Sequence, residues 1–199
     1  MQLPGGAVMA GRVNSDPRPA VFNTGQVLIG WAALGATGGA RIEQAARAAS
    51  TWMVALQEPD GRWARGNAAH AKVDIAVYNV KAAWGLCAAG VRWGWPDAVA
   101  AAVRNAEYCL AHQLPNGWFR DCCLSDAERP LLHTLAYSVQ GLLGIALLTG
   151  REDLLAGATR AADALALRMA PDGFLPGRFT SDTAARSWPR RPTTRCAGW

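Results

Sequence analysis

The sequence is organised around the stretch Gln57-Glu58-Pro59-Asp60-Gly61-Arg62-Trp63. Closely similar stretches follow at Gln113-Leu114-Pro115-Asn116-Gly117-Trp118-Phe119 and at Met169-Ala170-Pro171-Asp172-Gly173-Phe174. Their three glycines, Gly61, Gly117 and Gly173, stand 56 residues apart. A fixed period of this length, with the same residues each time, is typical of a repeat architecture. The sequence therefore predicts successive copies of one structural unit.

Each stretch is predicted to be a tight turn that ends a helix. Proline presets the backbone of the first central residue, Asp or Asn tolerates the next position, and glycine closes the turn. An aromatic residue follows within two positions each time, where it can lie back over the preceding helix. We therefore interpret Asp60 and Asp172 as turn residues and not as catalytic groups.

The composition is that of a globular chain. Of the 199 residues, 51% are hydrophobic and 18% are charged, which suits one domain with a full core. No run of eighteen or more apolar residues occurs, and residues 1–6 lack the pattern of a signal peptide. The five cysteines show no disulfide-scaffold spacing and no pair separated by two residues, so we expect reduced thiols. We expect a cytoplasmic protein without a membrane span.

The net charge of +5 is concentrated near the end of the sequence. Residues 176–199 hold five arginines against one aspartate, whereas the preceding residues are close to neutral. Nucleic-acid binding would need a basic patch on a folded face, and a short tail rich in Arg and Pro is weak support for one. We therefore expect no nucleic-acid partner.

Apolar residues recur at helical spacing in six segments, which pair into three antiparallel hairpins. The hairpins fall in units at about residues 21–63, 77–119 and 133–175, and the fold class is all-α. Glycine-containing breaks separate the two helices of each pair. Residues 1–20 are expected to be an irregular lead-in without a capping helix. Residues 176–199 are expected to be an irregular tail, typical of a truncated or frame-shifted gene or of a disordered segment.

The first helix of each hairpin carries two polar residues and a glycine at i, i+3 and i+7, on one helical face. These triples are Asn23, Gln26 and Gly30; Tyr78, Lys81 and Gly85; and Tyr137, Gln140 and Gly144. One interpretation is that the glycines allow close packing and the polar residues satisfy amides at the helix start. The other is that three helices present polar groups to a shared cavity. The substrate-binding candidates are then Asn23, Gln26, Tyr78, Lys81, Tyr137 and Gln140, together with Trp84. Trp31, Trp84, Leu142 and Leu143 are predicted to be buried.

These features resemble the α/α-toroid superfamily, whose members are rings of helical hairpins with an inner and an outer layer. The series Arg47-Ala48, Trp52, Gln57, Gly61 and Trp63 is similar to the Gln-Trp motif of terpenoid cyclases. His133-Thr134, Tyr137 and Gly141-Leu142 resemble an inner-helix start of protein prenyltransferases. Residues 22–28 and the Thr-Gly break between paired helices resemble equally the six-hairpin toroids of sugar-active enzymes, which are glycoside hydrolases, polysaccharide lyases and uronyl epimerase-like proteins. The resemblance covers about residues 21–175.

The resemblance implies that the first helix of each pair is inner and that the site lies where the inner helices begin. The loops at residues 64–77 and 119–132 lead into those starts. Their polar residues are His70, Lys72, Asp74, Arg120, Asp121, Asp126, Glu128 and Arg129. Each one alone is an ordinary solvated loop residue, but two loops that bring carboxylates to one rim favour a site. The catalytic candidates are Asp74, Asp121, Asp126 and Glu128, with His133 at the third inner helix.

The motifs for isoprenoid chemistry are absent. The sequence contains neither the Asp-x-Asp-Asp nor the Asp-Asp-x-x-Asp motif of terpenoid cyclases, and a polar site suits a hydroxyl-rich ligand better than a carbocation. Protein prenyltransferases hold zinc with Asp, Cys and His. Asp121, Cys123 and His133 supply these types, but His133 follows too soon in the sequence. We therefore expect no metal and no cofactor.

The function that these residues favour is that of a carbohydrate-active enzyme, acting on a polysaccharide or glycoside as a hydrolase, lyase or uronyl epimerase-like protein. Such reactions need two carboxyl groups, or an acid and a base, around the reacting bond. Asp74 with Asp121, Asp126 or Glu128 can supply the pair, and Tyr78, Tyr137 or His133 the proton. Two alternatives stay open: a terpenoid cyclase-like or prenyltransferase-like protein, and a non-catalytic toroid fragment that binds a glycan or a protein.

Three hairpins make an incomplete ring, because the toroids that the chain resembles close with about six. Such an arc leaves two apolar flanks without partners. We expect a saccharide or another small molecule as ligand, and self-association through the open flanks. A fragment that lacks half of its rim is expected to be inactive.

Overall fold

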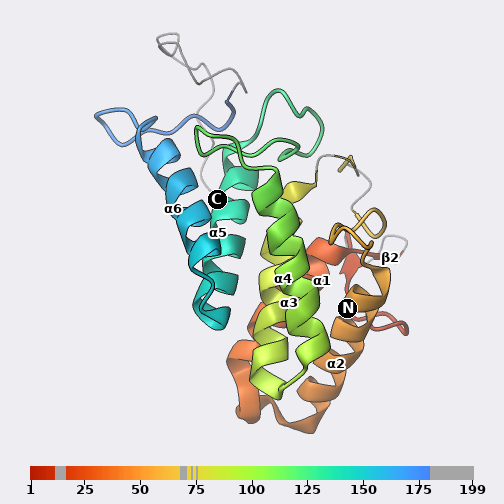
Figure 1. Ribbon diagram of the computed structural model, residues 1–199. Helices are drawn as coiled ribbons and strands as arrows, with labels where there is room; N and C mark the ends of the chain where they lie inside the picture. The colour runs from red at the N-terminus through yellow and green to blue at the C-terminus, as the bar shows by residue number, and fades with distance from the viewer. Residues whose placement is uncertain (12–16, 68–70, 73, 75, 180–199) are drawn as a thin grey trace.

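The computed structural model describes residues 1–11, 17–67, 71–72, 74 and 76–179 (Figure 1). Residues 180–199 and His70 lie outside this part of the chain. Within it the helices are α1 (Val21–Leu34), α2 (Gly39–Leu56), α3 (Val80–Trp93), α4 (Pro96–Ala111), α5 (Leu132–Thr149) and α6 (Glu152–Ala166). Two 3-10 helices, η1 (Gly35–Gly38) and η3 (Val77–Asn79), and two short antiparallel strands, β1 (Met9–Ala10) and β2 (Arg18–Pro19), complete the elements. The six predicted helices and the all-α class are confirmed.

The helices form an arc of three antiparallel hairpins, α1–α2, α3–α4 and α5–α6, in chain order (Figure 1). The inner layer consists of α1, α3 and α5, in which α3 packs against both of its neighbours. The outer layer consists of α2, α4 and α6, and each outer helix packs against the inner helix of its own hairpin. The predicted arrangement of about three hairpins in an incomplete ring is therefore the one observed.

The inner helices approach one another closely because glycines stand at their contacts. A Cβ atom on Gly85 would lie 2.0 Å from the backbone oxygen of Gly25 in α1. A Cβ atom on Gly144 would lie 2.5 Å from the ring of Trp84 in α3. The close-packing interpretation is therefore confirmed for these two members of the polar triples. Gly30, the equivalent residue of α1, has nothing within 4 Å of its would-be Cβ atom.

The repeated stretch forms the same turn each time, and its first two copies pack against the next outer helix. The amides of Gly61, Gly117 and Gly173 donate to the carbonyl three residues earlier, at 2.8–2.9 Å. All three glycines have φ between 81° and 91°, a conformation that favours glycine. A Cβ atom on Gly61 would lie 2.5 Å from the backbone oxygen of Arg104 in α4, and glycine is required there for this reason too.

A glutamine before the turn joins it to the next outer helix. Nε2 of Gln57 donates to the carbonyl of Gly61 at 2.9 Å and to that of Ala101 in α4 at 2.8 Å. Arg104 of the same helix donates back to Oε1 of Gln57 at 2.8 Å. We call this arrangement the glutamine clamp.

The second clamp has the same geometry. Nε2 of Gln113 donates to Gly117 at 3.1 Å and to Gly157 in α6 at 2.8 Å, and Arg160 donates to Oε1 at 2.7 Å. The clamps thus fasten α2 to α4 and α4 to α6.

Residues 2–6 form a further copy of the turn that the sequence analysis missed. Nε2 of Gln2 donates to Gly6 and to Ala45 in α2, both at 2.8 Å, and a Cβ atom on Gly6 would lie 2.3 Å from the carbonyl oxygen of Ala48. The lead-in therefore covers part of the first outer helix. This turn contributes a capping contact that the sequence did not predict.

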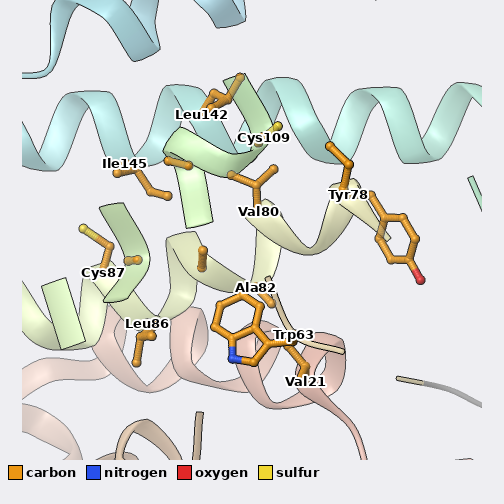
Figure 2. Packing of buried hydrophobic residues seen from close by; sticks show 14 of the residues in the cluster. Val21, Trp63, Tyr78, Val80, Ala82, Leu86, Cys87, Cys109, Leu142 and Ile145 are labelled. Carbon is orange, nitrogen blue, oxygen red and sulfur yellow. The ribbon is translucent and has the colours of Figure 1, made fainter. Parts of the chain in front are cut away.

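The core lies between the two layers and between neighbouring hairpins. Figure 2 shows α3 between α1 and α5, with Val80, Leu86 and Leu142 among the buried side chains. Trp63 folds back as predicted, and its Nε1 donates to the carbonyl of Met53 at 2.9 Å.

The predicted burial of the inner-helix side chains is correct only in part. Leu142 is fully buried, whereas Trp31 and Trp84 are half-buried. The prediction for Leu143 is wrong, because 38% of this residue is exposed.

By length and composition alone, α5 is the one described helix that could cross a membrane. Leu135, Leu142 and Ile145 of this helix are buried against the rest of the protein, as in the core helix of a globular domain.

Substitution of two equivalent glycines tests the inner-layer packing. Gly85→Ala is expected to lower the free energy of unfolding by roughly 1–3 kcal/mol, because its Cβ would overlap the backbone of α1. Gly30→Ala is the matched control and is expected to raise it by roughly 0.5–1 kcal/mol, since the site is open and alanine favours helix. Urea denaturation in dilute solution measures both. Equal effects of the two substitutions would contradict the packing described.

Candidate functional site

Aromatic side chains from the three inner helices meet where those helices begin. The ring centroid of Phe22 lies 5.8 Å from that of Tyr78 and 4.9 Å from that of Tyr137. His133 packs edge-on against Tyr137 at 5.7 Å. We call these four residues the aromatic cluster. It brings together three predicted site residues, Tyr78, Tyr137 and His133.

The aromatic cluster includes one residue that the sequence analysis missed. On α1 the ring contacts are made by Phe22, one position before the predicted Asn23. The signal for Phe22 was present, since it is an aromatic residue at the same helix start as Tyr78 and Tyr137. The predicted Gln140 lies one helical turn further along α5 and is exposed.

One helical turn further along the inner helices lie a cation, Lys81 of α3, and an amide, Gln26 of α1. Lys81 is only 9% exposed, and its Nζ lies 4.2 Å from the centroid of the Trp84 ring. Burial lowers the pKa of Lys81. Nε2 of Gln26 in α1 is buried without a hydrogen-bond partner among the described residues. A buried donor of this kind is normally satisfied, so the amide of Gln26 favours a bound polar ligand.

The two loops that lead into α3 and α5 lie against one another. Ala76 pairs with Cys122 in an isolated bridge, the amide of Val77 donates to the carbonyl of Asp121 at 3.2 Å, and that of Lys72 donates to Leu124 at 2.9 Å. The structure therefore places the described parts of the loops at 64–77 and 119–132 together, as expected for a shared rim.

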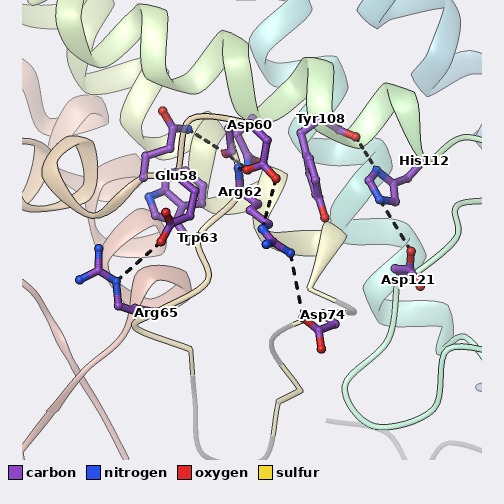
Figure 3. A network of polar contacts seen from close by, with 12 residues as sticks. Glu58, Asp60, Arg62, Trp63, Arg65, Asp74, Tyr108, His112 and Asp121 are labelled. Carbon is purple, nitrogen blue, oxygen red and sulfur yellow. Dashed lines mark hydrogen bonds and ion pairs between the residues drawn. The ribbon is translucent and has the colours of Figure 1, made fainter.

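Charged side chains at this rim form a network that crosses from the first unit to the second (Figure 3). Arg62 lies 3.2 Å from a carboxylate oxygen of Asp60 and 4.0 Å from one of Asp74. Nε2 of His112 lies 3.7 Å from a carboxylate oxygen of Asp121. The phenol of Tyr108 stands between these groups in Figure 3. Burial raises the pKa of Tyr108, and Arg62 acts in the opposite direction.

We call these six residues the polar network. Two of its members, Asp74 and Asp121, were predicted as catalytic residues. Arg62, Tyr108 and His112 were not singled out. They belong to the turn after α2 and to the end of α4, whereas the sequence analysis considered the loops that begin the inner helices.

His112 is held in one orientation and one tautomer. Its Nδ1 lies 2.8 Å from the carbonyl oxygen of Tyr108, and because a carbonyl can only accept, Nδ1 carries the proton. Nε2 is then the nitrogen that can take up or release a proton, and it faces Asp121. Asp121 has φ of 55°, which an aspartate tolerates better than most residues. Such a pair can perform acid–base chemistry.

The other predicted catalytic residues lie apart from this pair. Oδ1 of Asp126 accepts from the amide of Glu128 at 3.2 Å and stabilises a turn of its loop. Glu128 is exposed. His133 belongs to the aromatic cluster, where burial and then the charge of Arg178 lower its pKa.

The three zinc-ligand types do not converge. Asp121 faces His112, His133 faces Tyr137, and the thiol of Cys123 lies 3.5 Å from the carbonyl oxygen of Arg129. Across the described ranges, no group of three or more His, Cys, Asp or Glu side chains is placed to hold a metal ion.

No protein-family model matches this sequence, and no curated protein matches it. Solved structures do resemble it. A sugar epimerase from a ruminal bacterium has a TM-score of 0.62 at 15% identity, over 77% of this chain and 45% of that one. The unsaturated glucuronyl hydrolase of Bacillus sp. GL1 has a TM-score of 0.59 at 17% identity, over 81% of this chain and 50% of that one.

An unsaturated glucuronyl hydrolase specific for heparin has a TM-score of 0.53 at 13% identity, over 88% of this chain and 65% of that one. Likeness at this level of identity shows the fold. The chain therefore has an α/α-toroid fold, in which its three hairpins form an arc of the ring. It spans about half the length of the first two structures named.

Removal of the buried charge tests whether Lys81 is kept at a cost to stability. Lys81→Met is expected to raise the free energy of unfolding at pH 7. A methionine can pack on Trp84, and it carries no charge whose hydration is lost when the protein folds. The pKa of Lys81 is lowered in the folded protein. The loss of stability caused by its buried charge is therefore complete below that lowered pKa, and it vanishes above the pKa of about 10.4 that lysine has in the unfolded chain. The gain measured by urea denaturation should therefore shrink between pH 7 and pH 10.5. Destabilisation at pH 7 would contradict this role.

Proposed function

We propose that this chain belongs to a carbohydrate-active enzyme and binds a saccharide at the aromatic cluster. The observation that carries the proposal is the convergence of Phe22, Tyr78, Tyr137 and His133 at the inner-helix starts, beside two loops that supply carboxylates. A pyranose ring has apolar C–H faces and hydroxyl edges. Aromatic rings can cover the first, and groups such as Lys81 and Gln26 can hydrogen-bond the second.

The residues proposed for chemistry are Asp121, His112 and Asp74. Glycoside hydrolysis needs two carboxyl groups, and reaction at a uronic C5 needs an acid and a base. His112 supplies the acid or base at Nε2 with the carboxylate of Asp121 beside it, and Asp74 from the other loop supplies the second carboxylate. The likeness to a sugar epimerase and to glucuronyl hydrolases supports this class of reaction. The cytoplasmic location expected from the sequence stays a prediction.

The test is a ligand screen followed by one isosteric substitution. Oligosaccharides and uronic-acid polymers are compared with isoprenoid diphosphates, by calorimetry for binding and by release of reducing ends or unsaturated products for turnover. Asp121→Asn is expected to reduce turnover by at least about 100-fold and to leave binding within about threefold, as for loss of one acid–base group. Asp163→Asn, an exposed carboxylate on α6, is the control and should change neither.

Two outcomes would overturn the proposal. One is the absence of binding to every saccharide tested, and the other is selective binding of an isoprenoid diphosphate, which would favour the terpenoid cyclase-like alternative.

A non-catalytic glycan-binding protein is the second candidate. Asp74 favours it, because 91% of its side chain is exposed and its ion-pair contact to Arg62 is as long as 4.0 Å. A catalytic carboxylate is normally held more firmly. Saccharide binding without turnover in the wild-type chain, unaffected by Asp121→Asn, would select this candidate.

A further inference from the structure

We propose that two copies of this chain associate flank to flank and close a six-hairpin ring. The flank formed by α1 and α2 of one copy receives the flank formed by α5 and α6 of the other. Two copies related by a two-fold axis through the centre of the ring then form two identical contacts. The contact itself is independent of the proposed function. Only its consequence for the saccharide site rests on that function.

The first flank has an open space at the point where a Cβ atom of Gly30 would lie. We call such a space beside a glycine a notch. Gly30, Gly85 and Gly144 occupy the same position of the three polar triples. The notch at Gly85 is filled by the backbone of α1, and the notch at Gly144 is filled by the ring of Trp84. Nothing lies within 4 Å of the equivalent point on Gly30. The inner surface of α1 is therefore shaped for a preceding inner helix.

The second flank presents the matching side chain. Trp84, which fills the notch at Gly144, stands six residues after Tyr78 in the repeat. The residue six positions after Tyr137 is Leu143, and it is the exposed leucine whose burial was wrongly predicted. The exposure of Leu143 is explained if the notch that it fills belongs to another molecule. Leu143 of one copy would enter the notch at Gly30 of the other, as Trp84 enters that at Gly144.

Exposed apolar residues concentrate on the helices of the third hairpin. Six of the nine large hydrophobic residues that are exposed in the described chain lie on α5, on α6 or just after it. They are Leu143, Leu147, Leu148, Leu155, Leu167 and Met169. A repeat protein normally ends in a polar cap, so a flank of this composition fits a further hairpin.

In the outer layer, closure of the ring requires the turn at Gln2–Gly6 to give up its place on α2. The turn at Gly173 meets no outer helix, whereas those at Gly61 and Gly117 do. The equivalent place on α2 is held by the chain's own turn at Gln2–Gly6. The Gly173 turn of the second copy would compete with it. Weakening the first turn by Gln2→Ala, which removes two hydrogen bonds, should therefore favour the pair.

Closure would also complete the candidate site. The chain spans 45% and 50% of two solved toroids, so two copies supply a ring of about that length. The aromatic cluster of each copy lies on its inner layer, and the second copy would supply the inner helices that the arc lacks. A saccharide would then contact residues of both copies.

The experiment measures the mass of the 199-residue chain in solution by sedimentation equilibrium, from about 1 to about 100 μM. The expected result is a species of twice the chain mass of 21.1 kDa. Leu143→Lys and Gly30→Leu should each raise the dissociation constant at least about tenfold, and Gln2→Ala should lower it. Val91→Lys changes an exposed apolar residue on the central inner helix and should leave it unchanged. Circular dichroism confirms that each variant is folded.

A mixture of the two disruptive variants identifies the geometry. A Leu143→Lys copy retains an intact Gly30, and a Gly30→Leu copy retains an intact Leu143, so the mixture can form one of the two contacts. Association should therefore recover in part when the variants are mixed. A contact between two α5 flanks would instead leave Gly30→Leu without effect and would overturn the proposal.

A chain that is monomeric throughout this concentration range would also overturn it, as would an open polymer, which shows the contact without closure. The proposed function fails separately. A pair that binds no saccharide rejects the function alone, and a monomer that turns over a saccharide rejects the ring alone.

Discussion

The fold depends on a glutamine amide that donates two hydrogen bonds at once. In Gln57 and Gln113 one bond closes the turn after an outer helix, and the other reaches the backbone of the next outer helix. Each bond contributes about 0.5–1.5 kcal/mol net, which is modest alone. In a repeat protein, however, stability is the sum of the unit terms and the terms between neighbours. The glutamine clamp therefore sets how strongly each hairpin is coupled to the next.

The clamps and the inner glycines leave the two ends of the arc unequal. Gln2 repeats the clamp at the first outer helix, whereas Met169 replaces glutamine before the turn at Gly173. The glycine notch is empty at the first end, and the apolar side chain that would fill such a notch is exposed at the last. Complementary ends of this kind arise wherever a repeat is interrupted. They give the chain a defined direction in which a further unit can add.

Local patterns predicted most of the fold. The period of the turns and the helical spacing located all six helices, and the glycines at i+7 indicated the close inner contacts at Gly85 and Gly144. The turn at Gln2–Gly6 escaped, because Gly5 stands where the other turns have Asp or Asn and no helical pattern precedes it. Leu143 was misjudged for a different reason. Spacing shows which face of a helix is apolar but not whether a neighbour covers it.

The candidate site was predicted less completely. The spacing indicated Tyr78 and Tyr137. Their rings do meet, but through Phe22, which stands one position before the first residue of the polar triple on its helix. His112 and Arg62 depend on contacts between units, and no local pattern marks an outer-helix end as part of a site.

The most direct test of this account is the free energy of unfolding, from urea denaturation, of Gln57→Ala and Gln113→Ala, with the exposed Gln44→Ala of α2 as control. Each clamp variant loses two hydrogen bonds and an arginine contact, so the account predicts a decrease of about 1–3 kcal/mol for each, and little change for the control. Clamp variants as stable as the control would contradict the claim that this amide joins the units of the arc.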